Sequence, residues 1–285
     1  MTEHAQAASP EIANRIQIGE CTLNYHDQGE GDVILLIHGS GPGVTGWANW
    51  RGVIPTLSQR ARVIAPDMLG FGYTRCPSQW KLEPAIWVQS LIGLLDALDI
   101  KQVSIVGNSF GGAIALALAK AFPQRVKRLV LMGAAGLSFP ITDGLDKVWG
   151  YQPSLQAMRG LMEVFAYDHS LINDDLVSMR YQASIRDDVQ SRFAQLFPAQ
   201  RQQGVEMLAL AEEDLRALPH PTLLIHGRDD KVIPLELSER MLRLIPHSQM
   251  HVFGECGHWV QIEKAQAFNR LLVDFLVDQP ANAGA

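Results

Sequence analysis

Gly107-Asn108-Ser109-Phe110-Gly111 is the stretch of this 285-residue chain that decides which fold we predict. It fits the pattern G-x-S-x-G, follows the apolar run Val103–Val106 and precedes a helical pattern at Ala113–Phe122. A sharp turn from strand to helix presents a serine to substrate, and the flanking glycines leave room for neighbouring backbone. Free N–H groups at the start of the helix can stabilise a negatively charged oxygen. The stretch therefore predicts that Ser109 is a nucleophile at the end of a buried strand.

Other apolar runs without polar alternation predict the remaining strands of a parallel sheet. Such runs are typical of strands that are buried on both faces. Helical patterns such as Ala85–Leu98 separate them, and this alternation predicts an α/β fold with a mostly parallel, doubly wound sheet. The runs are Val33–Ile37, Arg62–Ala65, Val103–Val106, Leu129–Met132, Thr222–Ile225 and Gln249–Phe253.

The middle of the chain has a different texture, which predicts a helical insert. It has no β-branched run and shows helical spacing in Leu155–Phe165, Asp174–Ile185 and Asp188–Leu196. We therefore expect three parts: a first part of the α/β core at residues 1–136, a helical lid at 137–216, and a second part of the core at 217–285. Ligands of such a sheet bind at the carboxyl ends of its strands.

The composition excludes several classes of protein. Apolar residues make up 47% and charged residues 19% of the chain, so we do not expect a disordered or fibrous protein. The net charge of −6 argues against a nucleic-acid partner, which would need a basic face. No apolar stretch is long enough to span a membrane, and three cysteines are too few for a disulfide framework. The first fifteen residues lack a secretory signal, so we expect a cytoplasmic protein.

A nucleophilic serine needs a base, and the base needs an acid that holds its tautomer. His258 lies in Glu255-Cys256-Gly257-His258-Trp259, between the last predicted strand and the last predicted helix. The chain order Ser, Asp, His of this architecture places the acid between Ser109 and His258. Asp229 and Asp230 follow a strand there. The proline four residues after Asp230 favours Asp230 as the acid, with Asp229 as the alternative.

The oxyanion needs two N–H donors. One is the backbone N–H of Phe110, which follows the nucleophile, and the other is expected in a glycine-rich loop after an early strand. His38-Gly39-Ser40-Gly41-Pro42-Gly43 fits that place, with Ser40 and Gly41 at its centre and His38 as a structural hydrogen-bonding residue. The loop lacks the lysine of a phosphate loop. We expect no metal site.

At this point the motifs carry a resemblance to a known family. HGSGPG, APDMLGFG, GNSFGG, HGRDD with a following proline, and CGHW, in this order, resemble the α/β hydrolases. More narrowly, the chain resembles the carbon–carbon bond hydrolases of the meta-cleavage pathways for aromatic compounds, and most of all the 2-hydroxymuconic semialdehyde hydrolases. Four features mark this group: Asn108, the loop Ser40–Gly43, Trp259 and Arg180. The resemblance covers roughly Glu11 to Leu276.

The resemblance implies a small anionic substrate and a hydrolytic reaction. The substrate would be a 2-hydroxy-6-oxohexa-2,4-dienoate with a C6 substituent. Water would split its C5–C6 bond to give 2-hydroxypenta-2,4-dienoate and a small carboxylic acid. The resemblance implies no cofactor and a homodimer or higher homo-oligomer. Both an acyl-serine and a serine-assisted hydrate are compatible with the sequence.

The same resemblance implies roles for further residues. Arg180 on the lid would bind the substrate carboxylate as a bidentate donor, helped by Asn108 and Asn49. Trp259 and Phe110 would form walls for the dienoate. Ser40 would orient a water molecule or the C6 oxygen.

The C6 substituent would lie where the lid meets the loops at the sheet end. We expect its pocket to be formed by Ala135, Val205 and Ile233. The sizes of these side chains favour hydrogen, methyl or short alkyl groups, and leave phenyl open.

Two other functions are compatible with much of this evidence. A carboxylesterase or lactonase would use the same triad without needing Arg180. A ligand receptor on a hydrolase scaffold would use the triad weakly or not at all. A dehalogenase is disfavoured, since it would have aspartate in place of Ser109.

Overall fold

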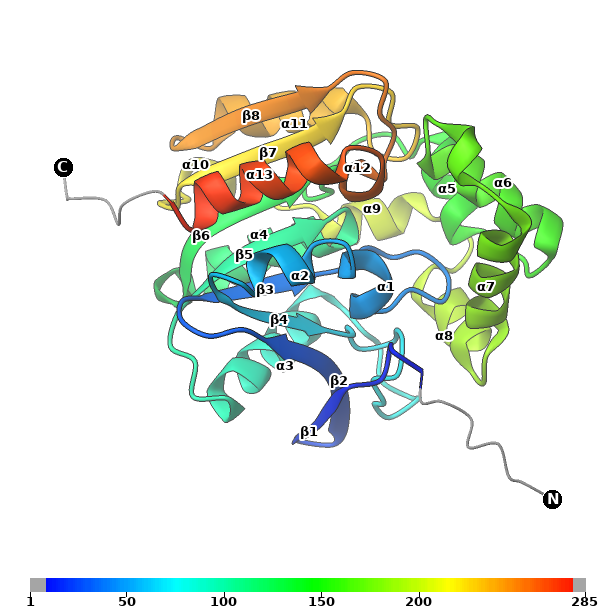
Figure 1. Ribbon diagram of the computed structural model, residues 1–285, viewed down its shortest axis with the longest axis horizontal. Helices are drawn as coiled ribbons and strands as arrows, with labels where there is room; N and C mark the ends of the chain where they lie inside the picture. Colours follow the sequence, from blue (N-terminus) through cyan, green and yellow to red (C-terminus); the bar gives the residue numbers. More distant parts are fainter. Residues whose placement is uncertain (1–8, 279–285) are drawn as a thin grey trace.

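The computed structural model describes residues 9–278, which form an eight-stranded sheet flanked by helices (Figure 1). The strands are β1 (Asn14–Ile18), β2 (Cys21–Gln28), β3 (Val33–Ile37), β4 (Arg62–Pro66), β5 (Val103–Asn108), β6 (Val126–Met132), β7 (Thr222–Gly227) and β8 (Ser248–Phe253). They lie in the order β1-β2-β4-β3-β5-β6-β7-β8. Strands β3 to β8 run parallel, while β1 and β2 form an antiparallel hairpin beside β4. The predicted mostly parallel α/β sheet is confirmed.

Helices cover both faces of the sheet, which explains why the strand sequences do not alternate with polar residues. In β3, Leu35 and Ile37 belong to the apolar core of one face. The alternate residues Ile34 and Leu36 belong to the core of the other face. The first core includes side chains of α3 (Pro84–Ala97), α4 (Phe110–Ala121) and α11 (Leu235–Leu244). The second includes side chains of α1 (Gly46–Trp50), α2 (Ile54–Leu57) and α13 (Ala265–Leu276).

A group of helices separates β6 from β7 in the chain, where the sequence predicts a helical lid, and we refer to these helices as the lid. Figure 1 shows α5 to α8 grouped beyond the carboxyl ends of the parallel strands. Side chains of Thr142, Ser154 and Asn173 cap α5, α6 and α7 by accepting a backbone N–H at each start. Within residues 9–278, no helix combines the length and apolarity needed to cross a bilayer. The inserted helices are α5 (Asp143–Trp149), α6 (Leu155–Phe165), α7 (Asp174–Ile185), α8 (Val189–Leu196), α9 (Gln202–Leu208) and α10 (Glu212–Arg216).

The turn between β5 and α4 is packed backbone against backbone. Helix α4 begins at Phe110, three residues earlier than the sequence pattern predicts, so the turn is very short. A Cβ atom on Gly107 would lie 2.5 Å from the carbonyl oxygen of Gly111. One on Gly111 would lie 2.3 Å from the carbonyl oxygen of Ile37, at the end of β3. These two glycines therefore bring the start of α4 directly against the neighbouring strand.

Replacing Gly111 by alanine tests this packing. The added methyl group would meet rigid backbone, so we expect Gly111→Ala to lower the free energy of unfolding by about 3 kcal/mol. Gly160→Ala is the control, because a Cβ at this position in α6 meets no atom within 4 Å. That variant should gain up to about 1 kcal/mol from the higher helix propensity of alanine. Urea unfolding of both variants measures the difference, and equal effects would contradict the packing argument.

Candidate active site

Ser109 lies at the tight turn that follows β5. Its backbone has φ 54° and ψ −116°, an uncommon conformation for a residue with a side chain. Backbone hydrogen bonds hold it there: its N–H donates to the carbonyl of Met132 at 3.0 Å, and its carbonyl accepts from the N–H of Ala135 at 3.1 Å. The first N–H groups of a helix have no acceptor within it, so the N–H of Phe110 is positioned to serve an external oxygen. The turn therefore combines a presented hydroxyl with an available donor.

His258 and Asp230 form a buried pair at the ends of β8 and β7. Nδ1 of His258 lies 2.7 Å from Oδ2 of Asp230. Oδ1 of Asp230 accepts the N–H groups of Val232 at 2.7 Å and Ile233 at 3.0 Å. Burial raises the pKa of Asp230, but the interactions with His258 and His226 outweigh it and hold that pKa well below its usual range. An ionised Asp230 keeps the proton of His258 on Nδ1 and leaves Nε2 free to act as a base.

The alternative acid, Asp229, has different partners. Its Oδ2 lies 3.7 Å from Nη2 of Arg228 and accepts the N–H of Cys256 at 3.4 Å. Its side chain is 31% exposed, whereas that of Asp230 is 1% exposed. Asp230 is thus the carboxylate that the structure brings to His258.

The last turn of lid helix α6 is hydrogen-bonded to the loop that carries His258. The carbonyl oxygen of Phe165 accepts the N–H of His258 at 2.7 Å and that of Trp259 at 3.2 Å. The ring of Phe165 also stacks on both of their rings, with centroids 5.9 Å and 5.2 Å away. Phe165, which no sequence motif marks, therefore joins the lid to the loop of the base.

Glu263 joins the same two segments from the other side. One carboxylate oxygen accepts the N–H of Gly257 at 2.8 Å. The other accepts the N–H groups of Tyr167 and Asp168, which follow α6, at 2.8 Å and 2.9 Å. Glu263 lies in the short helix α12 (Val260–Glu263), and sequence reasoning missed it because a glutamate in a helix is ordinary.

The glycine-rich loop after β3 is held by two aromatic side chains. His38 has the predicted structural role: its Nδ1 donates to the carbonyl of Gly39 at 2.7 Å and its Nε2 accepts the N–H of Met68 at 2.9 Å. Burial lowers the pKa of His38 to about 4, so it is neutral at physiological pH. Nε1 of Trp149, in lid helix α5, donates to Oγ of Ser40 at 3.0 Å. Because Oγ of Ser40 accepts this bond, the hydroxyl proton of Ser40 points away from Trp149.

Amide side chains beside the loop have unused hydrogen-bonding groups. Oδ1 of Asn49 accepts the N–H of Gly39 at 3.4 Å, while its Nδ2 is buried without a partner among the described residues. Oε1 of Gln261 is also buried without a hydrogen-bond partner among the described residues. Nδ2 of Asn108 donates to the carbonyl of Met132 at 3.3 Å. Because an unpaired buried polar group is costly, a ligand or water that pairs with these groups would be stabilised.

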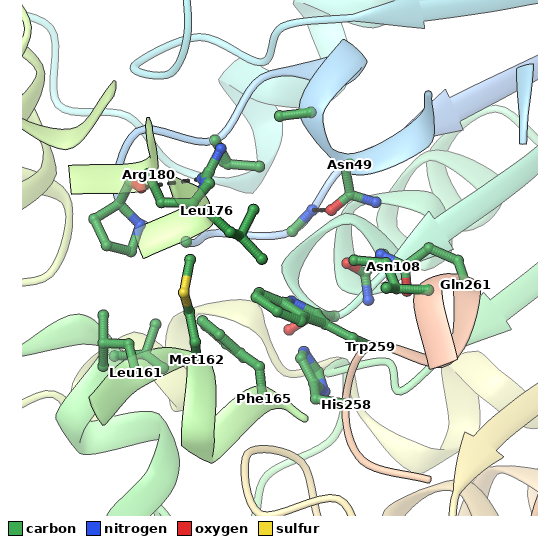
Figure 2. Close-up of a pocket in the computed structure, with 18 of the residues that line it drawn as sticks. Asn49, Asn108, Leu161, Met162, Phe165, Leu176, Arg180, His258, Trp259 and Gln261 are labelled. Carbon is green, nitrogen blue, oxygen red and sulfur yellow. Dashed lines mark hydrogen bonds between the residues drawn. The ribbon is translucent and has the colours of Figure 1, made fainter. Parts of the chain in front are cut away.

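These side chains meet at a cavity of about 390 Å³ (Figure 2). Arg180 enters it from lid helix α7 and donates from Nη2 to the carbonyl of Pro42 at 3.3 Å. Figure 2 shows Arg180 and His258 on different sides of the cavity, with Met162 and Phe165 between them along its apolar wall. Of the predicted site residues, the cavity is lined by Ser40, Gly41, Asn49, Asn108, Ser109, Arg180, His258 and Trp259.

Five predicted site residues do not line this cavity, and one of them is Asp230, which is buried and pairs with His258. The ring of Phe110 instead packs in the apolar core against Phe71 and against Trp87 of α3. Our expectation that it forms a wall was therefore wrong, although its N–H keeps the predicted place. The structure likewise does not bring the proposed substituent-pocket residues to this cavity: they are buried in the apolar core, and Val232 lines the cavity instead. These residues are Ala135, Val205 and Ile233.

Comparisons with known proteins agree with this geometry. The profile of the alpha/beta hydrolase fold matches residues 32–265. The chain is 55% identical to a 2-hydroxymuconate semialdehyde hydrolase of Pseudomonas sp. (strain CF600), over 98% of this chain and 99% of the relative. It is 56% identical to a 2-hydroxy-6-oxo-2,4-heptadienoate hydrolase of Pseudomonas putida, over 93% of this chain and 96% of the relative.

A solved structure shows the same relationship. The meta-cleavage product hydrolase from Pseudomonas fluorescens IP01, in complex with acetates, is 52% identical and superimposes with a TM-score of 0.92, over 93% of this chain and 97% of the other. The chain therefore belongs to the α/β hydrolase family, among the meta-cleavage product hydrolases.

Proposed function

We propose that the protein hydrolyses the C5–C6 bond of 2-hydroxy-6-oxohexa-2,4-dienoates, such as 2-hydroxymuconic semialdehyde and its 6-alkyl analogues. The products are 2-hydroxypenta-2,4-dienoate and a small carboxylic acid. The observation that carries the proposal is that one cavity is lined by Ser109, His258 and a lid arginine, Arg180. The relatives named above support the substrate class.

The chemistry needs a stabilised carbon leaving group. Ketonisation of the dienol moves a proton to C5 and forms a carbonyl at C2. Ser109 or a water molecule activated with its help then adds to C6, while His258 takes the proton and Asp230 stabilises the imidazolium. The N–H of Phe110 and the loop with Ser40 and Gly41 bind the oxygen on C6. When the C5–C6 bond breaks, its electrons pass through C4 and C3 to the C2 oxygen as a dienolate. Where Ser109 has added to C6, water activated by His258 then hydrolyses the acyl-serine and releases the carboxylic acid.

Arg180 supplies the binding energy for the carboxylate end. A guanidinium binds a carboxylate through two parallel hydrogen bonds. The weak 3.3 Å contact with Pro42 leaves most of its N–H groups available. The unpaired Nδ2 of Asn49 is available as a donor to the oxygen at C2, whereas the unpaired Oε1 of Gln261 can only accept, for example from the 2-hydroxyl of the dienol form. Charge at one end and the nucleophile at the other fix the direction in which the dienoate binds.

The proposal includes a homodimer that works in the cytoplasm. The three cysteines are free and buried, as is usual for proteins of a reducing compartment. Sedimentation velocity of the purified protein at micromolar concentration tests the dimer.

Stopped-flow absorbance tests the reaction directly. The yellow ring-fission products of catechol, 3-methylcatechol and 2,3-dihydroxybiphenyl are each mixed with the protein and with Ser109→Ala. We expect rapid loss of the yellow colour with the unaltered protein. The variant should bind substrate and stall, because it lacks the hydroxyl that adds to C6 or activates water. If the colour persists with all three while p-nitrophenyl acetate is hydrolysed efficiently, the protein is an esterase instead.

Arg180→Leu separates the two hydrolase functions. Loss of the cation should cost about 2–5 kcal/mol of transition-state binding for the dienoate, measured as kcat/KM. Hydrolysis of p-nitrophenyl acetate, which has no carboxylate, should change by less than about threefold. Equal losses on both substrates would show that Arg180 holds the lid together and binds no carboxylate.

Asp230→Asn tests the assignment of the acid. The amide favours the wrong tautomer of His258, so kcat should fall by about 10³- to 10⁴-fold. Asp229→Asn is the matched control. The carboxylate of Asp229 is adjacent in the chain but contacts Arg228 and the loop backbone instead of His258. We expect that variant to stay within about threefold of the unaltered protein. The reverse pattern would transfer the role to Asp229.

A further inference from the structure

Glu11 places a negative charge on the wall of a cavity that we assign to an anion. The charged carboxylate and guanidinium groups that line this cavity, among the described residues, belong to Glu11, Arg51 and Arg180. A fixed carboxylate repels a bound carboxylate across a partly buried space. Its presence therefore opposes the task of Arg180 and needs a physical reason.

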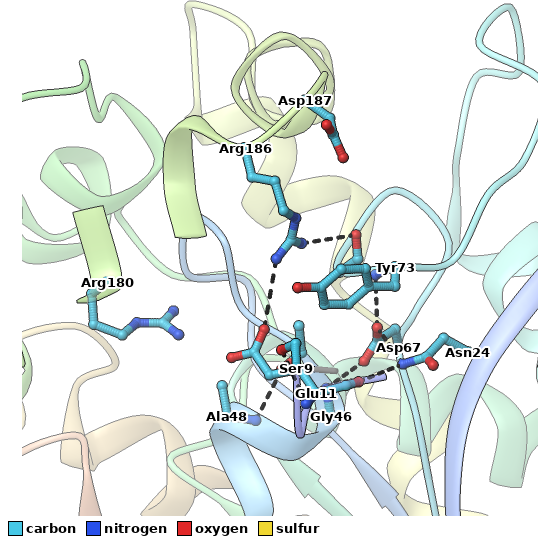
Figure 3. A network of polar contacts seen from close by, with 12 residues as sticks. Ser9, Glu11, Asn24, Gly46, Ala48, Asp67, Tyr73, Arg180, Arg186 and Asp187 are labelled. Atoms are coloured by element: carbon cyan, nitrogen blue, oxygen red, sulfur yellow. Dashed lines mark hydrogen bonds and ion pairs between the residues drawn. The ribbon is translucent and has the colours of Figure 1, made fainter. Parts of the chain in front are cut away.

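The position of Glu11 is built into the fold (Figure 3). The carbonyl of Glu11 accepts from Nδ2 of the fully buried Asn24 at 2.9 Å, and Oδ1 of Asn24 accepts the N–H of Ala13 at 3.1 Å. Asn24 is tied in turn to the buried carboxylate of Asp67 at 2.9 Å. These hydrogen bonds of Asn24, in β2, fix the segment before β1 and bring the side chain of Glu11 to the cavity.

The charge of Glu11 is only loosely compensated. Its Oε2 lies 3.7 Å from Nη1 of Arg186, which is longer than a hydrogen bond. Arg186 has other contacts: its guanidinium lies 3.7 Å from the ring centroid of Tyr73 and donates to the carbonyl of Gly72 at 3.3 Å. Part of the field of Glu11 therefore reaches into the cavity.

Arg180 lies within that field. Figure 3 shows its guanidinium directed toward the carboxylate of Glu11. Burial lowers the pKa of Arg180, and the charges of Arg51 and Arg186 lower it further, while the charge of Glu11 raises it. Each of these groups thus interacts with the cation that would hold the substrate.

We propose that Glu11 sets the affinity of the cavity for a carboxylate. Its negative charge weakens the binding of the carboxylate by Arg180, so that the dienoate product can leave. This inference rests on the proposed carboxylate site at Arg180. Substrate and product share the carboxylate end, so a stronger site would bind both more tightly without favouring the transition state. A nearby negative charge lowers both affinities by a similar factor.

Calorimetric titration with stable ligands tests the proposal without any turnover. The probes are (2E,4E)-hexa-2,4-dienoate and its neutral amide, which share shape and differ in charge. Glu11→Gln should lower the Kd of the dienoate by about three- to tenfold, as expected for removal of one unit charge several ångströms away. The Kd of the amide should not change. Glu11→Ala should act in the same direction, and Glu11→Asp, which keeps the charge, should behave like the unaltered protein.

Asp27→Asn is the matched control. Asp27 forms an ion pair with Arg62, and their side chains are 22% and 29% exposed. The side chains of Glu11 and Arg186 are similarly exposed, at 18% and 21%. Unlike Glu11, Asp27 does not line the cavity. It should leave both Kd values unchanged. An unchanged or higher Kd for the dienoate in Glu11→Gln would overturn the proposal. Parallel changes for dienoate and amide would also overturn it, by assigning Glu11 a purely structural role.

Arg180→Leu separates failure of this inference from failure of the proposed function. If that variant binds the dienoate as well as the unaltered protein does, the carboxylate site itself is wrong. If it loses dienoate binding while Glu11→Gln changes nothing, the site stands and only the role of Glu11 is rejected.

Discussion

Contact between backbones at the carboxyl ends of the strands is the constraint on which the site depends. The first turn of α4 touches the end of β3 with no side chain between them, since Gly111 would otherwise clash with Ile37. This closeness places the nucleophile beside the glycine-rich loop that follows β3. Gly133, after β6, extends the same arrangement: a Cβ there would lie 3.2 Å from atoms of both Asp230 and His258. The parts of the triad meet because Gly111 in α4 and Gly133 after β6 carry no side chain where these segments approach their neighbours.

The buried Asp230 shows how the fold keeps a charge inside without a surface partner. Two backbone N–H groups and His258 satisfy its oxygens, and Nε2 of His226 lies 3.4 Å from the second oxygen. His226 is held in place by Ser238 and by the carbonyl of Ile233. A buried charge with this many partners is retained in spite of its desolvation. The acid is therefore oriented by two backbone N–H groups and by His226 as well as by its bond to the base.

Much of the fold and of the triad could be predicted from the sequence, because both are encoded locally. A run such as Val33–Ile37 is buried on both faces, and the structure gives the strand these same bounds. The roles of Phe165, Glu263 and Glu11 could not be predicted, since they arise from contacts between segments far apart in the chain. Local sequence patterns also could not predict where a single side chain points. Phe110 is an example, because its ring packs in the core and not in the cavity. Packing on the sheet decides such directions.

The bond between Phe165 and the loop of His258 has a consequence for how the protein exchanges ligands. Lifting the end of α6 away from the sheet would break both hydrogen bonds to the carbonyl of Phe165, while His258 would keep its bond to Asp230 and Gly257 its bond to Glu263. The backbone position of the base is therefore coupled to the position of this end of α6. A ligand that displaces this end on entry or exit would also disturb the backbone that positions the base.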